Sequence, residues 1–182
     1  MRHGQAISNV KALCSCWPEK FYNPLTKLGR EMVKTSAGNL KKSGRCIDYI
    51  FASPLLRTKQ TSLIVGRIFK VKPKTEKRLK EIDFGEYNGK NLEGMWKSFK
   101  HEEERIHKGA DGGETYTQIL DRMLGVVKDL EKKYKGKNIM LISHEGPLFL
   151  LHGKIMGLTI KETIGKFSLE KRIHKSEIRE LN

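Results

Sequence analysis

Two arginines and two histidines in this chain could act together on a phosphoryl group if the fold brings them to one place. Arg2 and His3 are adjacent at the start of the sequence, and Arg57 and His144 each follow an apolar segment. Guanidinium groups bind phosphate oxygens through paired, charge-assisted hydrogen bonds, and they do so better than lysine side chains. A neutral imidazole can attack phosphorus, which divides the transfer into two easier steps. These residue types therefore indicate phosphoryl-transfer chemistry.

The other tasks of phosphoryl transfer suit a second imidazole and a carboxyl group. A second histidine can bind a phosphoryl oxygen and stabilise the charge that develops on it. A carboxyl group that burial or neighbouring anions keep protonated can donate a proton to the leaving alkoxide. This chemistry needs no metal ion, and the sequence has none of the usual spacings of metal ligands. We therefore expect neither a metal nor another cofactor.

Two apolar runs predict the strands that would position these side chains. Residues 47–52 and 138–143 are nearly continuously apolar, which is typical of strands with both faces covered. Because ligands bind at the carboxyl edge of open α/β sheets, Arg57 and His144 would reach the same rim of the sheet. The Arg2-His3 segment would join them there if it follows a central strand.

Helical patterns alternate with these strands and predict an α/β fold with a largely parallel sheet. Thr26 can cap the first helix. The helix after the first strand offers several apolar side chains for burial, namely Leu56, Leu63, Ile64 and Ile68. The expected helices cover residues 27–42, 55–69, 115–134 and 147–156. Residues 85–113 are less regular, and we interpret them as an excursion that covers a cleft within a single domain of residues 1–182.

The composition is that of a basic globular chain. Its 182 residues include 36 Lys and Arg against 21 Asp and Glu, a net charge of +15. Such a charge favours anionic ligands, but the positive residues are spread out and no nucleic-acid-binding motif is present, so we expect no nucleic-acid partner. No apolar stretch approaches the roughly 18–20 residues that span a bilayer, and no signal-peptide pattern opens the sequence. We expect a cytoplasmic protein without a membrane partner.

The cysteines give no sign of a disulfide framework, because there are three of them, Cys14, Cys16 and Cys46. Cys14 and Cys16 could supply two thiolates to a metal, but no second Cys/His pair stands at a matching spacing. We expect ordinary thiols in a reducing compartment.

The order and spacing of several motifs resemble the histidine phosphatase superfamily, also called the phosphoglycerate mutase-like proteins. The resemblance runs across almost the whole chain. Each motif is modest alone, but in this order they are specific. The matching motifs are Arg2-His3-Gly4-Gln5 with Asn9, Pro24-Leu25-Thr26 with Gly29, Ser53-Pro54-Leu55 with Arg57-Thr58 and Thr61, Leu79-Lys80-Glu81-Ile82-Asp83-Phe84-Gly85 with Gly89, Gly112-Gly113-Glu114, and Ser143-His144-Glu145-Gly146.

This resemblance implies a three-layer α/β/α sandwich with a mostly parallel central sheet, and it implies a role for each matching residue. His3 would be the nucleophile that becomes phosphohistidine, and His144 would take part in catalysis beside it. Glu81 would be the proton donor, with Asp83 and Glu86 as alternative donors nearby in the sequence. The residues that bind the phosphoryl group would be Arg2, Asn9, Arg57 and His144.

The activity that the resemblance implies is metal-independent hydrolysis of a phosphomonoester, with a small phosphorylated metabolite as substrate. The short chain and the Leu79–Gly85 segment are similar to the phosphatase branch, which includes broad-specificity and α-ribazole phosphatases. A cofactor-dependent phosphoglycerate mutase is one alternative. A non-catalytic module that only binds phosphate is another, and members of the family are monomers or homodimers.

The sequence departs from the family pattern in three places. Glu145 stands where many members have glycine, and Gln5 replaces the commoner glutamate. The family has an apolar strand before the Arg-His-Gly motif, whereas here only Met1 precedes Arg2. We therefore expect the first strand of the sheet to be missing or truncated in a sequence that begins late, with its place in the core empty or filled by another segment.

Overall fold

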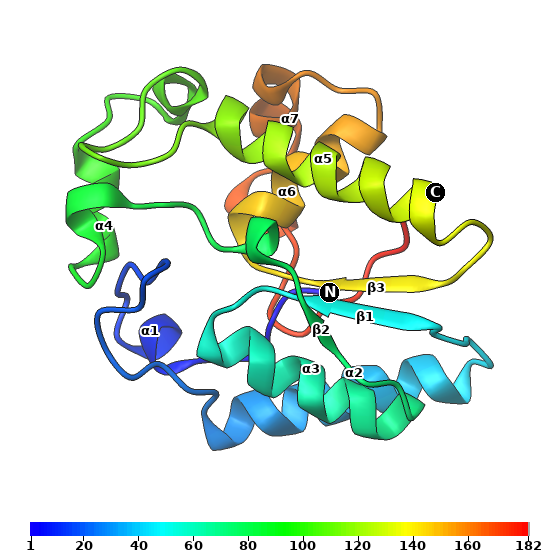
Figure 1. Cartoon of the computed structure of the whole chain (residues 1–182). Coiled ribbons are helices and arrows are strands. Elements are labelled where there is room, and N and C mark those ends of the chain that lie inside the picture. The colour runs from blue at the N-terminus through cyan, green and yellow to red at the C-terminus, as the bar shows by residue number, and fades with distance from the viewer. Residues whose placement is uncertain (182) are drawn as a thin grey trace.

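Three parallel strands form the centre of the computed structural model, which describes residues 1–181 (Figure 1). The spatial order is β2 (Lys74–Thr75), β1 (Tyr49–Ala52) and β3 (Ile139–Ile142). The register pairs Tyr49 with Ile139 and continues to the carboxyl ends of both strands. The sequence predicts β1 and β3 correctly. It does not reveal β2, because two exposed residues, Lys and Thr, carry no apolar pattern.

Helices cover both faces of this sheet, so the architecture is the expected three-layer α/β/α sandwich (Figure 1). One layer contains α2 (Lys27–Lys42) and α3 (Leu56–Phe69), and the other contains α5 (Tyr116–Lys133) and α6 (Glu145–Ile155). The remaining helical segments are α1 (Ile7–Val10), α4 (Leu92–Lys97), α7 (Ile160–Lys166), and the short 3-10 turns η1 (Lys77–Leu79), η2 (Gly85–Tyr87), η3 (Glu102–Ile106) and η4 (Leu169–Lys171). Among the described residues, no helix is both long and apolar enough to cross a membrane.

Local sequence explains where the long helices begin and which sides they bury. The Thr26 hydroxyl accepts a hydrogen bond from the Gly29 amide at 2.9 Å, as its capping role predicts. The expectation of a buried Leu63 is wrong, because this side chain is 53% exposed. The inner face of α3 is built instead from small residues at helical spacing, which a search for apolar residues overlooks: Thr58, Thr61, Ser62, Val65 and Gly66.

The start of the chain lies beside the carboxyl end of β3. The Met1 amino group donates to the Leu141 carbonyl at 2.8 Å, and the His3 amide donates to the Ser143 carbonyl at 3.1 Å. Residues 1–3 thus extend the sheet by a parallel bridge between Arg2 and Ser143. These three residues occupy part of the place of the strand that we expect, from the sequence, to be missing or truncated. Further along β3, a groove of about 430 Å³ is lined by residues that include Met1, Leu40, Ile139, Leu148 and Ile178.

The end of the chain flanks the same segment on its other side. The Arg2 amide donates to the Glu177 carbonyl at 3.1 Å, and the Ser176 amide donates to the His3 carbonyl at 3.1 Å. The Arg2-His3 pair is therefore held between β3 and the C-terminal segment, at the rim that the sheet topology predicts.

The 11–23 segment and the 85–113 excursion meet at the carboxyl edge of the sheet, on the side of the molecule where α1 and α4 lie, and an antiparallel bridge joins Leu13 to Asn91 (Figure 1). The Cys14 amide donates to the Lys90 carbonyl at 2.9 Å, and the Gly89 amide donates to the Cys14 carbonyl at 2.9 Å. These backbone contacts place two irregular segments around the region that receives the ends of β1 and β3. That the excursion covers a cleft stays a prediction.

Candidate active site

The structure brings together five of the residues that the sequence singles out. The His3 and His144 ring centroids are 5.2 Å apart, and the Arg57 Nε donates to the His3 Nε2 at 3.1 Å. The His144 Nδ1 lies 3.7 Å from a Glu81 carboxyl oxygen. Arg2 precedes His3 beside the end of β3, while Arg57 lies in the first turn of α3. Four separate segments therefore supply one cluster: the Arg2-His3 segment, α3, the loop that carries Glu81 and the residue after β3.

His3 is held in one tautomer by its neighbours. Its Nδ1 lies 2.6 Å from the Gly4 carbonyl, so Nδ1 carries the proton and donates. The Nε2 atom then has a lone pair, which accepts from Arg57. Burial, followed by the positive charges of Arg57 and Arg2, lowers the pKa of His3 well below its usual value. The imidazole is therefore neutral at pH 7, and its free lone pair is on Nε2.

His144 is oriented by Ser53, which follows β1. The His144 Nε2 lies 2.7 Å from the Ser53 hydroxyl, and burial lowers the pKa of His144 well below its usual value. When the hydroxyl donates to Nε2, the proton of the neutral ring lies on Nδ1. This Nδ1 is buried without a hydrogen-bond partner among the described residues, and so is the Arg2 Nε. Two unsatisfied donors within one cluster suit an anion with several oxygens.

Both arginines already hold carboxylates of this chain. The Arg57 Nη2 donates to the Ser15 carbonyl at 2.9 Å, and its Nη1 lies 3.4 Å from a Glu19 carboxyl oxygen. Arg2 forms an ion pair with Glu145, the residue that replaces the family's usual glycine. The positions of both guanidinium groups are therefore fixed by contacts within the chain.

Glu81 has the environment of a proton donor. Burial raises the pKa of its carboxyl group above the usual value, despite the opposing charge of Arg57. Its Oε1 accepts from the Ile82 amide at 2.9 Å, which leaves Oε2 toward His144. Among the contacts of the described residues, none joins either alternative donor to the histidines: Asp83 accepts from the Gly85 amide, and Glu86 pairs with a lysine at the surface.

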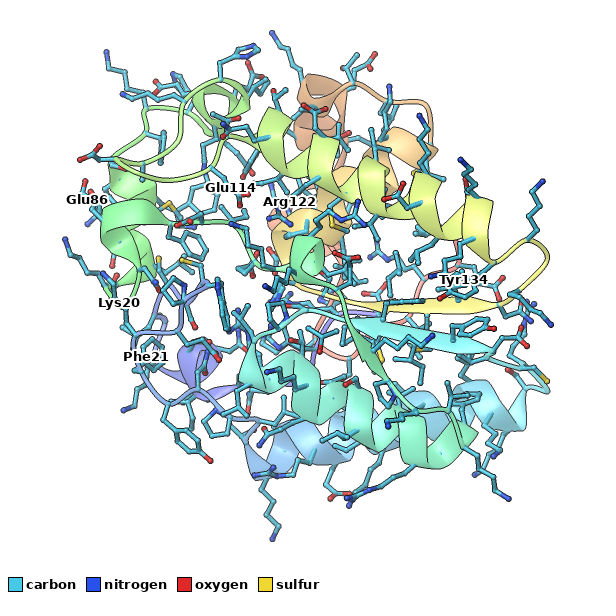
Figure 2. The ribbon with its side chains drawn as sticks, in the orientation of Figure 1. Lys20, Phe21, Glu86, Glu114, Arg122 and Tyr134 are labelled. Carbon is cyan, nitrogen blue, oxygen red and sulfur yellow. The ribbon has the colours of Figure 1, made fainter. Side chains whose placement is uncertain are left out.

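Arg122 of α5 holds the Glu81 loop in position. Its guanidinium group donates to the carbonyls of Arg78 at 2.6 Å, Lys80 at 2.9 Å and Glu81 at 3.3 Å. It also pairs with Glu114 at 2.9 Å, and the two side chains point toward one another in Figure 2. Although burial raises the pKa of Glu114, hydrogen bonds from Arg122 and its charge hold that pKa below the usual value.

Asn9 is the predicted site residue that the structure leaves apart from the cluster. Its side-chain oxygen accepts from the Ala6 amide at 2.9 Å and closes the first turn of α1. Among the hydrogen bonds of the described residues, none joins Asn9 to the two histidines or the two arginines. Its role as a phosphate ligand stays a prediction.

Several contacts of the site are not evident from sequence. Ser53 belongs to a matching motif, but nothing in the motif states that its hydroxyl orients His144. Ser15 and Glu19 lie on an irregular segment without apolar periodicity, so no pattern points to their contacts with Arg57. Arg122 stands on an amphipathic helix, where an arginine ordinarily belongs to the solvated face.

The chemistry of the donor set favours an anion. Guanidinium and imidazole N–H groups converge here, and among the described residues no group of three or more His, Cys, Asp and Glu side chains is placed to hold a metal ion. The three cysteines form no disulfide among the described residues; Cys14 and Cys16 are buried and Cys46 is exposed.

Curated relatives include both phosphatases and mutases. Phosphoserine phosphatase 1 of Hydrogenobacter thermophilus is 25% identical over 143 residues, which are 76% of this chain and 67% of that protein. A probable phosphoglycerate mutase of Photorhabdus laumondii is 26% identical over 163 residues, covering 87% of this chain and 74% of the relative. Fructose-2,6-bisphosphatase of Saccharomyces cerevisiae is 26% identical over 170 residues, 89% of this chain but 34% of that longer protein.

Solved structures share the fold at lower identity. A mycobacterial glucosyl-3-phosphoglycerate phosphatase in complex with VO3 has a TM-score of 0.81 at 20% identity, over 96% of this chain and 87% of the other. The alpha-ribazole phosphatase from Shigella flexneri has a TM-score of 0.77 at 21% identity, over 97% and 85%. The model of the histidine phosphatase superfamily (branch 1) matches residues 1–171. The chain therefore belongs to the histidine phosphatase superfamily and is an enzyme of the phosphatase type.

Proposed function

We propose that this enzyme hydrolyses small phosphomonoesters without a metal ion, through a phosphohistidine formed on His3. The observation that carries the proposal is the state of His3, a buried neutral imidazole whose Nε2 lone pair lies 3.1 Å from the Arg57 Nε. A neutral nitrogen lone pair beside a guanidinium group is arranged to attack a phosphoryl group that the guanidinium holds.

In the first step, the His3 Nε2 attacks phosphorus and the bond from phosphorus to the leaving oxygen breaks. Glu81, whose pKa is raised by burial, donates a proton to that oxygen. In the second step, water attacks the phosphohistidine and gives a proton to the Glu81 carboxylate. The phosphorus–nitrogen bond breaks, and the electron pair returns to Nε2.

The phosphoryl oxygens would be bound by Arg2, Arg57 and the Nδ1–H of His144, with Asn9 as an additional donor. The unsatisfied buried donors of Arg2 and His144 support this assignment. As negative charge develops on the oxygens, these fixed donors stabilise the transition state more than the ground state.

The names of the relatives support a small metabolite as the substrate. Phosphoserine, glucosyl-3-phosphoglycerate and alpha-ribazole phosphate are the substrates that the names of three similar phosphatases indicate. The +15 net charge of the chain favours the approach of such anions. We propose a phosphorylated small molecule of this class, acted on by a monomer or homodimer in the cytoplasm.

The test is hydrolysis of p-nitrophenyl phosphate by the wild-type chain and by His3→Ala. We expect His3→Ala to lose at least about a thousandfold in kcat, because the covalent route requires Nε2. Rapid quenching with a radiolabelled substrate should trap a phosphoenzyme in the wild type alone. Turnover that persists in His3→Ala would overturn the mechanism.

A second assay separates hydrolysis from the mutase alternative. With 3-phosphoglycerate and catalytic 2,3-bisphosphoglycerate, a mutase forms 2-phosphoglycerate, whereas a phosphatase releases inorganic phosphate. We expect phosphate release without isomerisation for any substrate that a panel of metabolite phosphates identifies. Isomerisation faster than phosphate release would instead establish the mutase.

A further inference from the structure

Glu19 makes the contacts at Arg57 that an incoming anion would make. Its Oε1 lies 3.4 Å from the Arg57 Nη1, and its Oε2 accepts from the Leu56 amide at 2.8 Å. Leu56 is the first residue of α3, so one carboxylate meets both the helix N-terminus and a guanidinium group that is only 2% exposed. The Glu19 side chain itself is 17% exposed.

The hydrogen-bonding capacity of Arg57 is largely occupied. Its Nε donates to His3, its Nη2 to the Ser15 carbonyl, and its Nη1 to the Ser15 hydroxyl as well as toward Glu19. A guanidinium group has five N–H donors in a fixed fork. A phosphoryl oxygen that takes two of these donors must therefore replace a present partner, and Glu19 is the negatively charged one.

We propose that Glu19 is an internal competitor of the substrate, a carboxylate that holds Arg57 in the free enzyme and leaves when the phosphoryl group binds. This inference rests on the proposed function, since it assigns Arg57 to the phosphoryl group. Two anions cannot share one guanidinium group without strong mutual repulsion in a buried site. Glu19 therefore sets the affinity for the phosphoryl group, and its return favours the release of phosphate.

The segment that carries Glu19 is arranged so that it can move. Among the described residues, no backbone-to-backbone hydrogen bond involves residues 17–22, and the Asn88 side chain donates to the Pro18 carbonyl at 2.9 Å. Lys20 and Phe21, which follow Glu19, lie at the edge of the molecule near the 85–113 excursion (Figure 2). Trp17 is 45% exposed. Displacement of Glu19 breaks few other contacts, so the binding energy of a phosphoryl group can accomplish it.

Glu145 differs from Glu19 in this respect. It pairs with Arg2, but it is the first residue of α6 and its backbone is fixed by an eleven-residue helix. Its side chain can rotate, but its backbone cannot move away from Arg2 without a movement of α6. The proposal is therefore specific to Glu19.

The test compares Glu19→Gln with the wild type in binding orthovanadate, a phosphate analogue. The amide oxygen of glutamine still accepts from the Leu56 amide, but the negative charge on Arg57 is gone. We expect the dissociation constant measured by calorimetry to fall about fivefold, the effect of removing one partly exposed ion pair. The matched control is Glu31→Gln on α2, which removes the same charge from an exposed pair with Lys34 and should leave the constant unchanged.

Fluorescence provides a second readout in a Trp96→Phe background, where Trp17 is the remaining tryptophan. We expect orthovanadate to shift the Trp17 emission, and we expect free Glu19→Gln to show part of that shift already. If Glu19 serves only to hold the segment in place, Glu19→Gln will lower the melting temperature and bind orthovanadate no better than the wild type. That result overturns this inference and leaves the hydrolytic mechanism standing, whereas a wild type that binds no orthovanadate overturns both.

Discussion

Burial shifts the pKa values of His3 and Glu81 in opposite directions. Between their reference pKa values of 4.5 and 6.5, a solvated glutamate is ionised and a solvated histidine is charged. In the folded site the pKa of His3 is lowered by burial and by Arg57, and that of Glu81 is raised by burial. Both shifts favour the protonation states that the proposed mechanism uses, a neutral His3 and a protonated Glu81.

Replacing Glu81 tests the donor at the scale of a single residue. We expect Glu81→Gln to lower kcat by about 10²–10⁴ for an alkyl phosphate, whose alkoxide needs a proton to leave. The loss should be much smaller for p-nitrophenyl phosphate, because nitrophenolate leaves readily without one. For the wild type acting on the alkyl ester, kcat/KM should fall as pH rises through the raised pKa of Glu81, and this dependence should vanish in the variant.

The control for this experiment is Asp83→Asn, which changes the neighbouring carboxylate. Its kcat should stay near that of the wild type, since Asp83 accepts from the Gly85 amide and does not contact the histidines in the described part of the chain. An equal loss for both leaving groups in Glu81→Gln would exclude proton donation as the role of Glu81.

Residue types and their order allowed the cluster to be predicted, but not its local contacts. Arg57 and His144 follow predicted parallel strands, so topology alone places them at one edge. The contact of Glu19 with Arg57 depends on the path of an irregular segment. The contacts of Arg122 depend on how α5 is rotated about its axis. Neither leaves a periodic signal in the sequence, because each contact joins residues that are far apart along the chain.

At the scale of elements, the position of His3 depends on a close contact between two backbones. The segment that follows His3 crosses the start of α2 there. The Thr26 amide donates to the Gln5 carbonyl at 2.9 Å. A Cβ atom at Gly29 would lie 2.0 Å from that carbonyl oxygen, and one at Gly4 would lie 2.4 Å from the Gly29 carbonyl oxygen. Two glycines therefore let the strand end and the helix touch. The motifs contain both of them, yet sequence alone does not show that they face each other.

Gly29→Ala should separate these elements. We expect it to lower the free energy of unfolding by about 1–3 kcal/mol, because the clash is with backbone atoms that cannot rotate away. Urea denaturation would measure the change, and kcat should fall as the segment after His3 moves. Gly38→Ala is the control in the same helix: a Cβ there meets nothing within 4 Å, so alanine should stabilise by about 0.5–1 kcal/mol. Equal effects of the two substitutions would refute the crossing as the cause.

The elements that could be predicted from the sequence are those with the strongest apolar patterns. The long amphipathic helices and the two apolar strands were evident, whereas β2, α4 and α7 are too short or too polar to produce a pattern. Their positions come from tertiary contacts, such as the pairing of β2 with the edge of β1.

At the scale of the whole molecule, two buried neutral imidazoles link stability to pH. The pKa of His3 and of His144 is lowered on folding, from 6.5, so the unfolded chain binds more protons below that value. The contribution of these two histidines to stability is therefore complete about one pH unit above 6.5 and is lost progressively as the pH falls through and below that value.

We expect the free energy of unfolding to decrease between about pH 7.5 and about pH 5.5. Each buried neutral histidine lowers the free energy of unfolding by about 1.4 kcal/mol for each pH unit below its unfolded pKa. His3→Gln removes one of the two contributions, so urea titrations should show a shallower dependence in that variant. The same slope in both proteins would mean that His3 is not buried in its neutral form.

Segments from distant parts of the sequence meet at the proposed nucleophile, since His3 bonds on one side to the strand end at Ser143 and on the other to Ser176. Synthesis proceeds from His3 toward Ser143 and Ser176, so both of these neighbours are made after it. The proposed site is therefore completed late in synthesis, because contacts across such long sequence separations form only after the intervening chain has been made. His3 is therefore translated long before the residues that hold it in place.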